Sequence, residues 1–241
     1  STGVALVAKR NDNAPTTMTW IPIVSPSDSF KAPSIDDSRQ DIGSDGQHLY
    51  MSMGANSDSI YKVSIATKSL VGTIPFYGYY SSIEYAEDYL WATNSNTIRK
   101  LNKITGEELQ VSPAIGDYTI SGLAYDGQYF WCNGSGNRSD TIFKYDPINN
   151  SIVSKVPLID RAEFSGMAYA NGYLYVCGGG FVHKCTTSPF KAIKTYKIET
   201  IESNGYGGIT GIAYDGSNFW IKAEKGYEDN EGVWLYKVNL D

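Results

Sequence analysis

The chain has 241 residues, of which 41% are hydrophobic, and its formal net charge is -6. A chain of this length and composition is expected to bury one core and to fold as a single domain covering residues 1–241. The acidic balance argues against a nucleic-acid partner, and no apolar run approaches the roughly 20 residues that cross a bilayer, so we expect a soluble chain without membrane insertion.

Two β-rich stretches come first in the chain, "GVALVAK" at Gly3–Lys9 and "TTMTWIPIV" at Thr16–Val24. The apolar part of the first stretch is too short for a signal peptide, and its charges lie on the wrong side. Compartment and source therefore stay open, although an extracellular or surface location is favoured over a cytoplasmic one. What these stretches do depends on the pattern that follows them.

A repeat begins near residue 39. Each unit has a polar turn, then a large apolar residue, then an aromatic residue, as in "AYDGQYFW" and "AYDGSNFW". The aromatic residues are spaced by 41, 40, 44 and 45 positions and are Tyr50, Trp91, Trp131, Tyr175 and Trp220. A second series keeps the same phase and consists of Lys62, Lys100, Lys144, Lys184 and Lys237. Short strands repeated every 40 to 45 residues are typical of β-propellers.

Each unit is expected to form four antiparallel strands. Asp126-Gly127, Asn171-Gly172 and Asp215-Gly216 tolerate the positive φ angles of tight hairpins, so each joins a first strand to a second. The first strands are rich in Gly and Ala, as expected where strands converge on a narrow axis. The sequence therefore predicts an all-β, five-bladed β-propeller with blades that start near residues 39, 80, 119, 163 and 208.

The repeat "GLAYDGQYFWCNGSGNRSDTIFKYDPINNSIV" resembles those of NHL-like and quinoprotein-like propellers, and the resemblance covers residues 39–241. It implies the fold and not an activity. Five-bladed propellers of similar size include tachylectin-type lectins, olfactomedin domains, arabinan-degrading glycosidases and plant-type glutaminyl cyclases. The sequence shows none of the motifs that distinguish these families.

The last unit ends after its third strand, which would leave an open sheet edge. We expect an N-terminal strand at about residues 16–24 to complete this blade and close the ring. Gly3–Lys9 is an alternative closing strand or an extra outer one.

Function is sought in the loops, because variable connections on a rigid scaffold carry the sites. The loops that lead into the first strands are dense in Tyr, Asn, Asp and Gly, a composition that suits sugars as well as protein partners. We expect ligand contacts from Tyr77, Tyr79, Tyr80, Asp117, Tyr118, Asp160, Arg161, Asn204 and Tyr206. The recurring Trp and Tyr residues of the repeat are instead assigned to packing between blades.

The sequence offers few candidate residues for catalysis or for binding a cofactor. The carboxylates that could serve a glycosidase are Glu84, Asp117, Asp160 and Glu163. No cofactor is expected; the acidic loop Glu224–Gly232 could hold calcium but lacks EF-hand spacing. Three cysteines leave at least one thiol free, and Cys177 and Cys185 could form a bridge across a hairpin.

The sequence thus favours a non-enzymatic, lectin-like module that binds a carbohydrate or another surface ligand. The first alternative is a propeller that binds a protein partner or has a structural role, such as a surface or virion component. The second alternative is a glycan hydrolase or lyase.

Overall fold

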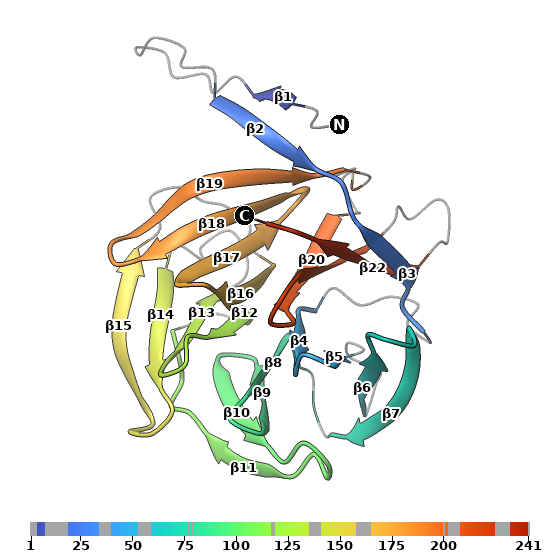
Figure 1. The fold of residues 1–241 in the computed structure, drawn as a ribbon. Coiled ribbons are helices and arrows are strands. Elements are labelled where there is room, and N and C mark those ends of the chain that lie inside the picture. Colours follow the sequence, from blue (N-terminus) through green and yellow to red (C-terminus); the bar gives the residue numbers. More distant parts are fainter. Residues whose placement is uncertain are drawn as a thin grey trace.

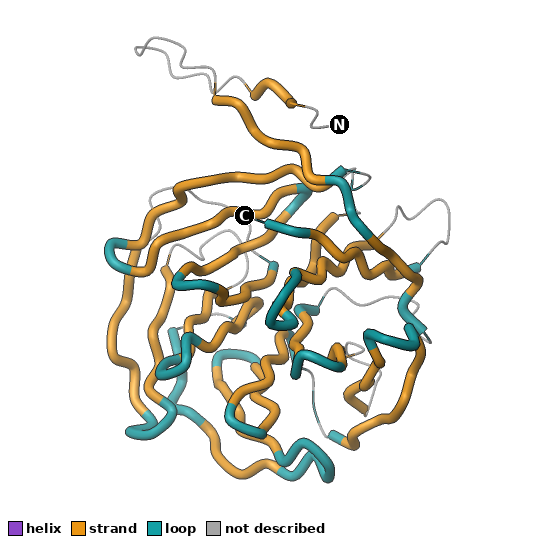
Figure 2. The backbone as a smooth tube through the Cα atoms, viewed as in Figure 1, coloured by secondary structure: helices purple, strands orange, loops and turns teal. Residues whose placement is uncertain are grey.

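The computed structural model is a five-bladed β-propeller, in which five sheets stand around a central axis (Figure 1). It describes residues 4–7, 19–33, 40–52, 59–76, 78, 80–116, 119–134, 141–157, 165–199, 201, 208–224 and 232–240. These residues form strands, turns and loops and contain no helix (Figure 2). No segment among them is therefore a helix that could cross a membrane.

The first three blades each use four consecutive antiparallel strands. Blade 1 contains β4 (Ile42–Ser44), β5 (His48–Ser52), β6 (Ser59–Ser64) and β7 (Ser69–Pro75). Blade 2 contains β8 (Ser82–Ala86), β9 (Tyr89–Asn94), β10 (Thr97–Leu101) and β11 (Glu108–Val111). Blade 3 contains β12 (Ile120–Tyr125), β13 (Phe130–Gly134), β14 (Thr141–Asp146) and β15 (Ser151–Pro157).

The last two blades take in the N-terminal strands. Blade 4 contains β16 (Gly166–Ala170), β17 (Tyr173–Gly178), β18 (Phe181–Thr187) and β19 (Phe190–Ile198). Blade 5 contains β20 (Gly208–Tyr214), β21 (Phe219–Glu224), β22 (Val233–Val238) and β3 (Asp28–Lys31). The outer edge of blade 4 carries β2 (Thr19–Val24) and then β1 (Val4–Val7).

An N-terminal strand does close the ring, but it is β3 and not the segment at residues 16–24. β3 pairs antiparallel with β22, and its Phe30 is buried against Trp220 with ring centroids 5.7 Å apart. β2 instead pairs in parallel with β19 through Ile23 and Val24 alone. Pro22 has no N–H to donate, which fits the start of this pairing at Ile23. β1 pairs with β2 as an extra outer strand (Figure 1).

The two repeating series of the sequence are direct neighbours in every blade. Each aromatic residue on the second strand lies opposite a lysine on the third, as Trp131 lies opposite Lys144 and Trp220 opposite Lys237. The Lys144 ammonium lies 5.0 Å from the centroid of the Trp131 ring, a cation–π contact. The aromatic residues are all buried and belong to the cores between neighbouring blades, which confirms their structural role.

A β-bulge in the fourth strand lets one strand serve two cores. In β15 the extra residue is Val153, which lies between the partners of Lys144 and Tyr145. Ile152 packs into the core shared with blade 2, whereas Val156 packs into the core shared with blade 4. Residues four apart would share one face of a regular strand, so the bulge is what turns them to opposite faces.

The same bulge recurs opposite the lysine series in β7, β11 and β19. In β7, Leu70 and Ile74 likewise pack into different cores, one shared with blade 5 and the other with blade 2. The bulge is thus part of the repeat and has a packing role.

Candidate functional site

The five first strands, β4, β8, β12, β16 and β20, surround the axis (Figure 1). We call the end at which they begin the loop end, and the end at which they turn into the second strands the hairpin end. Strand register places equivalent residues of the blades in rings around the axis. The cross-strand partners show this, since equivalent second-strand residues pair with Ser82, Gly122, Gly166 and Gly211. The rings can therefore be read in order from the loop end.

Four rings surround the loop half of the axis. The rim ring, nearest the loops, is Gln40, Ser81, Ser121, Ser165 and Thr210. The floor ring, one residue further along, is Asp41, Ser82, Gly122, Gly166 and Gly211. The second-strand ring, which flanks the floor, is Ser52, Thr93, Asn133, Cys177 and Lys222. The third ring, two residues beyond the floor, is Gly43, Glu84, Ala124, Ala168 and Ala213.

Within the floor ring, the Asp41 side chain makes the hydrogen bonds that connect the blades, and it is fully buried. Its Oδ1 accepts hydrogen bonds from the backbone N–H of Ile42 and of Ile212, both at 2.9 Å. Its Oδ2 accepts from the N–H of Met167 at 3.1 Å and from the Ser82 hydroxyl at 3.0 Å. One carboxyl group thereby joins first strands of blades 1, 2, 4 and 5.

Burial dominates the protonation of Asp41. It raises the pKa of this carboxyl to about 7, against the lowering effect of the four hydrogen bonds. The Ser82 hydroxyl can turn from donor to acceptor, so it can partner either protonation state.

The second-strand ring links three of the blades to the next one at this level. The Ser52 hydroxyl donates to the Tyr80 carbonyl oxygen at 2.6 Å, and the Thr93 hydroxyl donates to that of Ile120 at 3.2 Å. The Lys222 ammonium donates to the Gln40 carbonyl oxygen at 2.7 Å and joins blade 5 to the start of blade 1.

Both Lys222 and Asp41 are fully buried. Burying a charge is unfavourable unless hydrogen bonds compensate, which is why this level carries so many of them.

The rim ring presents hydroxyl and amide groups around the loop end. Ser121, Ser165 and Thr210 are half-buried, whereas Gln40 and Ser81 are buried. The Asn133 side-chain amide donates to the Ser121 hydroxyl at 3.1 Å. The Ser81 hydroxyl has no hydrogen-bond partner among the described residues. The loop end of the axis is therefore polar in a molecule whose blades are joined by apolar cores.

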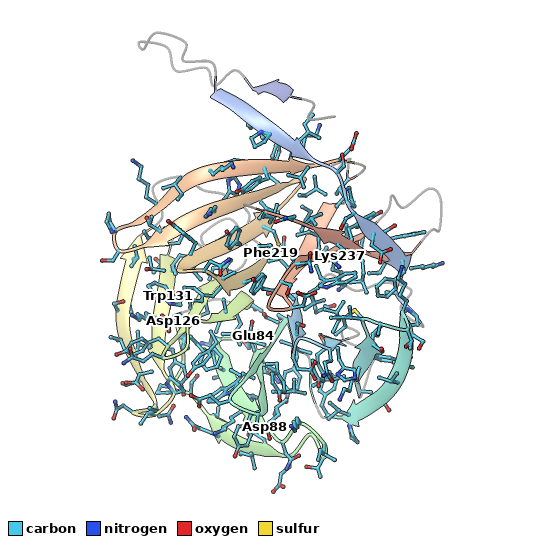
Figure 3. The ribbon with its side chains drawn as sticks, in the orientation of Figure 1. Glu84, Asp88, Asp126, Trp131, Phe219 and Lys237 are labelled. Carbon is cyan, nitrogen blue, oxygen red and sulfur yellow. The ribbon has the colours of Figure 1, made fainter. Side chains whose placement is uncertain are left out.

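Glu84 lies in the third ring, beyond the floor, and its side chain is half-buried. Figure 3 shows it near the centre of the ring, among the first strands. Its four counterparts are Gly or Ala, so it has the only long side chain in this ring. Burial, and secondly the nearby Asp41 carboxyl, raise the pKa of Glu84 well above its ordinary value of 4.5.

Two of the residues predicted for the site fall within the described part of the chain. Glu84 lies at the axis as stated above. Tyr80 is buried in the core between blades 1 and 2, where its ring stacks on Phe76 at 4.6 Å, so its ring is not presented to a ligand. The others lie outside the described residues and are Tyr77, Tyr79, Asp117, Tyr118, Asp160, Arg161, Glu163, Asn204 and Tyr206.

Sequence reasoning missed the residues at the centre of the loop end, above all Asp41, Lys222 and Asn133. A signal was present in the repeat. Asp41 stands where three other blades have Gly, and Lys222 stands where the others have Ser, Thr, Asn or Cys. Aligning the five units column by column would have marked both as departures from the pattern.

The structure gives no support to a cysteine bridge. Cys132, Cys177 and Cys185 are free and buried, and Cys177 lies opposite Val182 while Cys185 lies opposite Leu174. Burial raises the pKa of each thiol, which keeps them protonated. Within the described residues no group of three or more His, Cys, Asp or Glu side chains is placed to hold a metal ion. The acidic stretch proposed for calcium lies almost wholly outside them.

No family model and no curated protein matches this chain. Among solved structures, it is similar to the Myxococcus xanthus glutaminyl cyclase, with 12% sequence identity, a TM-score of 0.68, and 91% of this chain and 97% of that chain covered. A luciferin-regenerating enzyme gives 15% identity, a TM-score of 0.55, and coverage of 88% and 95%. Kuenenia stuttgartiensis hydrazine synthase gives 15% identity and a TM-score of 0.52, with 79% of this chain and 56% of that chain covered. At these identities the likeness concerns the fold alone.

Proposed function

We propose that the protein is a carbohydrate-binding propeller whose site is the loop end of its axis. The observation that supports this best is the polar character of that end. Of the ten residues in the rim ring and the second-strand ring, Cys177 is the one that is not polar in the usual sense. Elsewhere the contacts between blades are made by apolar cores.

The chemistry of the rim matches that of a sugar. The hydroxyl groups of Ser121, Ser165 and Thr210, the half-buried residues of the rim, both donate and accept hydrogen bonds, as do the vicinal hydroxyl groups of a pyranose.

The Tyr residues predicted for the site adjoin this rim in the sequence. Tyr79 precedes Ser81 by two positions, and Tyr118 precedes Ser121 by three. Tyr rings next to the rim would stack on the C–H face of the sugar.

A glycan array tests the proposal. The wild-type protein should bind a defined set of glycans, and Ser165→Val and Thr210→Val should weaken that binding by about tenfold each, because each loses a hydrogen bond to the ligand. Tyr118→Ala should weaken it as well. Thr73→Val, which alters an exposed position on β7, is the matched control and should bind like the wild type.

An array without any bound glycan would contradict the proposal. Retention of one specific protein from the native source in that case would favour the protein-interaction alternative.

An enzymatic role is the second candidate, and Glu84 is the observation that favours it. A half-buried carboxyl group with a raised pKa can act as an acid near neutral pH. One similar structure is that of a glutaminyl cyclase, so the direct assay is cyclisation of a peptide with N-terminal glutamine. Turnover that disappears in Glu84→Gln while the fold is retained would replace the binding proposal.

A glycosidase that pairs Glu84 with Asp41 is not supported. Asp41 is fully buried, and all four of its hydrogen bonds are made within the protein. A glycosidase needs two carboxyl groups that both reach the scissile bond.

A further inference from the structure

The axis is closed at the level of the floor ring. Asp41 is fully buried and bonds to first strands on both sides of the axis, from Ser82 in blade 2 to Met167 in blade 4 and Ile212 in blade 5. Lys222 and Asn133, which flank the floor, are also buried. The floor therefore separates the loop end from the region that contains Glu84.

The glycines of the floor ring show how little space is left. A Cβ atom added at Gly166 would lie 2.4 Å from Asp41 Oδ1, and one added at Gly122 would lie 2.8 Å from Met167 Cγ. A Cβ added at Gly211 would lie 3.0 Å from the Asp41 Cα. Because no methyl group fits at these positions, the first strands are in close contact around the axis. With the buried Asp41 carboxyl between them, they leave no passage for a ligand through the floor.

We infer that the loop end is a blind site that takes the terminal residue of a glycan chain and not an internal one. This inference rests on the carbohydrate-binding function proposed above. One residue below the rim, the Asp41 carboxyl alone reaches four of the five first strands, so the rim is narrow as well. Only a group of about the size of a single sugar can therefore reach its half-buried residues, Ser121, Ser165 and Thr210, together. The floor then prevents the chain from continuing past that sugar.

The site has two further consequences for its ligand. The ligand enters and leaves from the loop end, so a polymer cannot be threaded along the axis. Glu84 lies beyond the floor and is not reached by a ligand seated on the rim. Binding should therefore be insensitive to Glu84→Gln, in contrast to an enzyme that uses this carboxyl group.

The test uses matched pairs of glycans immobilised through their reducing ends. In each pair, one member ends in a sugar that the wild-type protein binds, and the other carries one additional sugar on that same residue. We expect the added sugar to weaken binding at least tenfold, and the free monosaccharide of the terminal type to compete fully. Glu84→Gln should leave both results unchanged.

The outcomes separate the two proposals. If capped and uncapped glycans bind equally, the blind-site inference is wrong while carbohydrate binding stands. If Glu84→Gln abolishes binding with the fold intact, the ligand passes the floor and the inference is again wrong. If no glycan binds at all, the proposed function fails and the inference fails with it.

Discussion

Asp126 Oδ2 accepts a hydrogen bond of 2.7 Å from the indole Nε1 of Trp131, five residues along the chain (Figure 3). The other carboxylate oxygen accepts from the backbone N–H groups of Gln128 and Tyr129, at 2.9 and 2.7 Å. Asp215 and Trp220 repeat the same arrangement in blade 5. In blade 2 the equivalent residue is Ala86, and the buried Trp91 Nε1 has no hydrogen-bond partner among the described residues. One aspartate thus accepts hydrogen bonds both from the N–H groups of the hairpin turn and from the buried indole N–H.

Asp126→Ala should lower the free energy of unfolding by about 2 to 3 kcal/mol, because two turn N–H groups and the indole N–H lose their acceptor. Asp146 is the matched control, since it accepts from two turn N–H groups, those of Ile148 and Asn149, and from the exposed Asn149 side-chain amide, but from no indole. Asp146→Ala should cost about 1 kcal/mol. Urea unfolding of the three proteins measures the difference, and equal losses for the two variants would show that the indole bond contributes nothing.

Deletion of Val153 should turn β15 into a regular strand and leave blade 3 folded. Without the extra residue, Ile152 and Val156 are three positions apart and stay on opposite faces, so both keep their cores and the deletion should cost at most about 1 kcal/mol. Val153→Ser keeps the bulge and alters a side chain that is half exposed, so its effect should stay within about 0.5 kcal/mol. Thermal unfolding checks both variants. A loss of about 2 to 5 kcal/mol, as expected for an emptied core position, would mean that Ile152 and Val156 do not keep their facing in a regular strand.

Gly166→Ala should destabilise the protein through the floor ring. The new methyl group would meet the Asp41 carboxyl and the Gly211 Cα, at 2.4 and 2.9 Å, in a region without free space. Overpacking of this kind costs about 1 to 3 kcal/mol. Gly72→Ala is the control: it lies within β7, and a Cβ there meets nothing within 4 Å. Gly72→Ala should be neutral or slightly stabilising. Urea unfolding measures the stability of both variants, and equal stabilities would contradict a packed floor ring.

The repeat made the fold predictable from the sequence. The spacing of Trp131 and Lys144 marks the second and third strands of a blade, and these residues are indeed cross-strand partners. The closing strand was harder to find. Residues 16–24 have strong β propensity, whereas β3 reads Asp-Ser-Phe-Lys and has a single buried side chain, Phe30. Its pairing is decided by the open edge of β22 and by the packing of Phe30 against Trp220, which are tertiary features.

The candidate site was less predictable for a related reason. Loop composition gave residues that are predicted to lie near the axis, but it gave no order of residues along the axis. The role of Asp41 depends on N–H groups of Met167 and Ile212, which are 126 and 171 positions away in the sequence. Such contacts appear only when the five first strands are brought together.

Asp41 should give the protein a characteristic dependence of stability on pH. The folded state holds the Asp41 proton up to a pKa of about 7, whereas the unfolded chain loses it near 3.8. Between these values the folded state binds one more proton than the unfolded state, so the contribution of Asp41 to stability falls as the pH rises from about 4 to about 7 and is constant above that. The slope is at most about 1.4 kcal/mol per pH unit.

Asp41→Asn provides the reference, because an amide does not titrate in this range. The variant should be less stable than the wild type, since its NH₂ group cannot accept one of the four hydrogen bonds, and its deficit should be largest at about pH 4 and should shrink toward pH 7. Glu84 also has a raised pKa and faces Asp41, so the series is repeated in Glu84→Gln to isolate the Asp41 effect from that of its neighbour. Urea unfolding at four pH values gives the comparison. A deficit that grows with pH would mean that the protein holds the ionised carboxylate in preference, and the four hydrogen bonds would then outweigh burial.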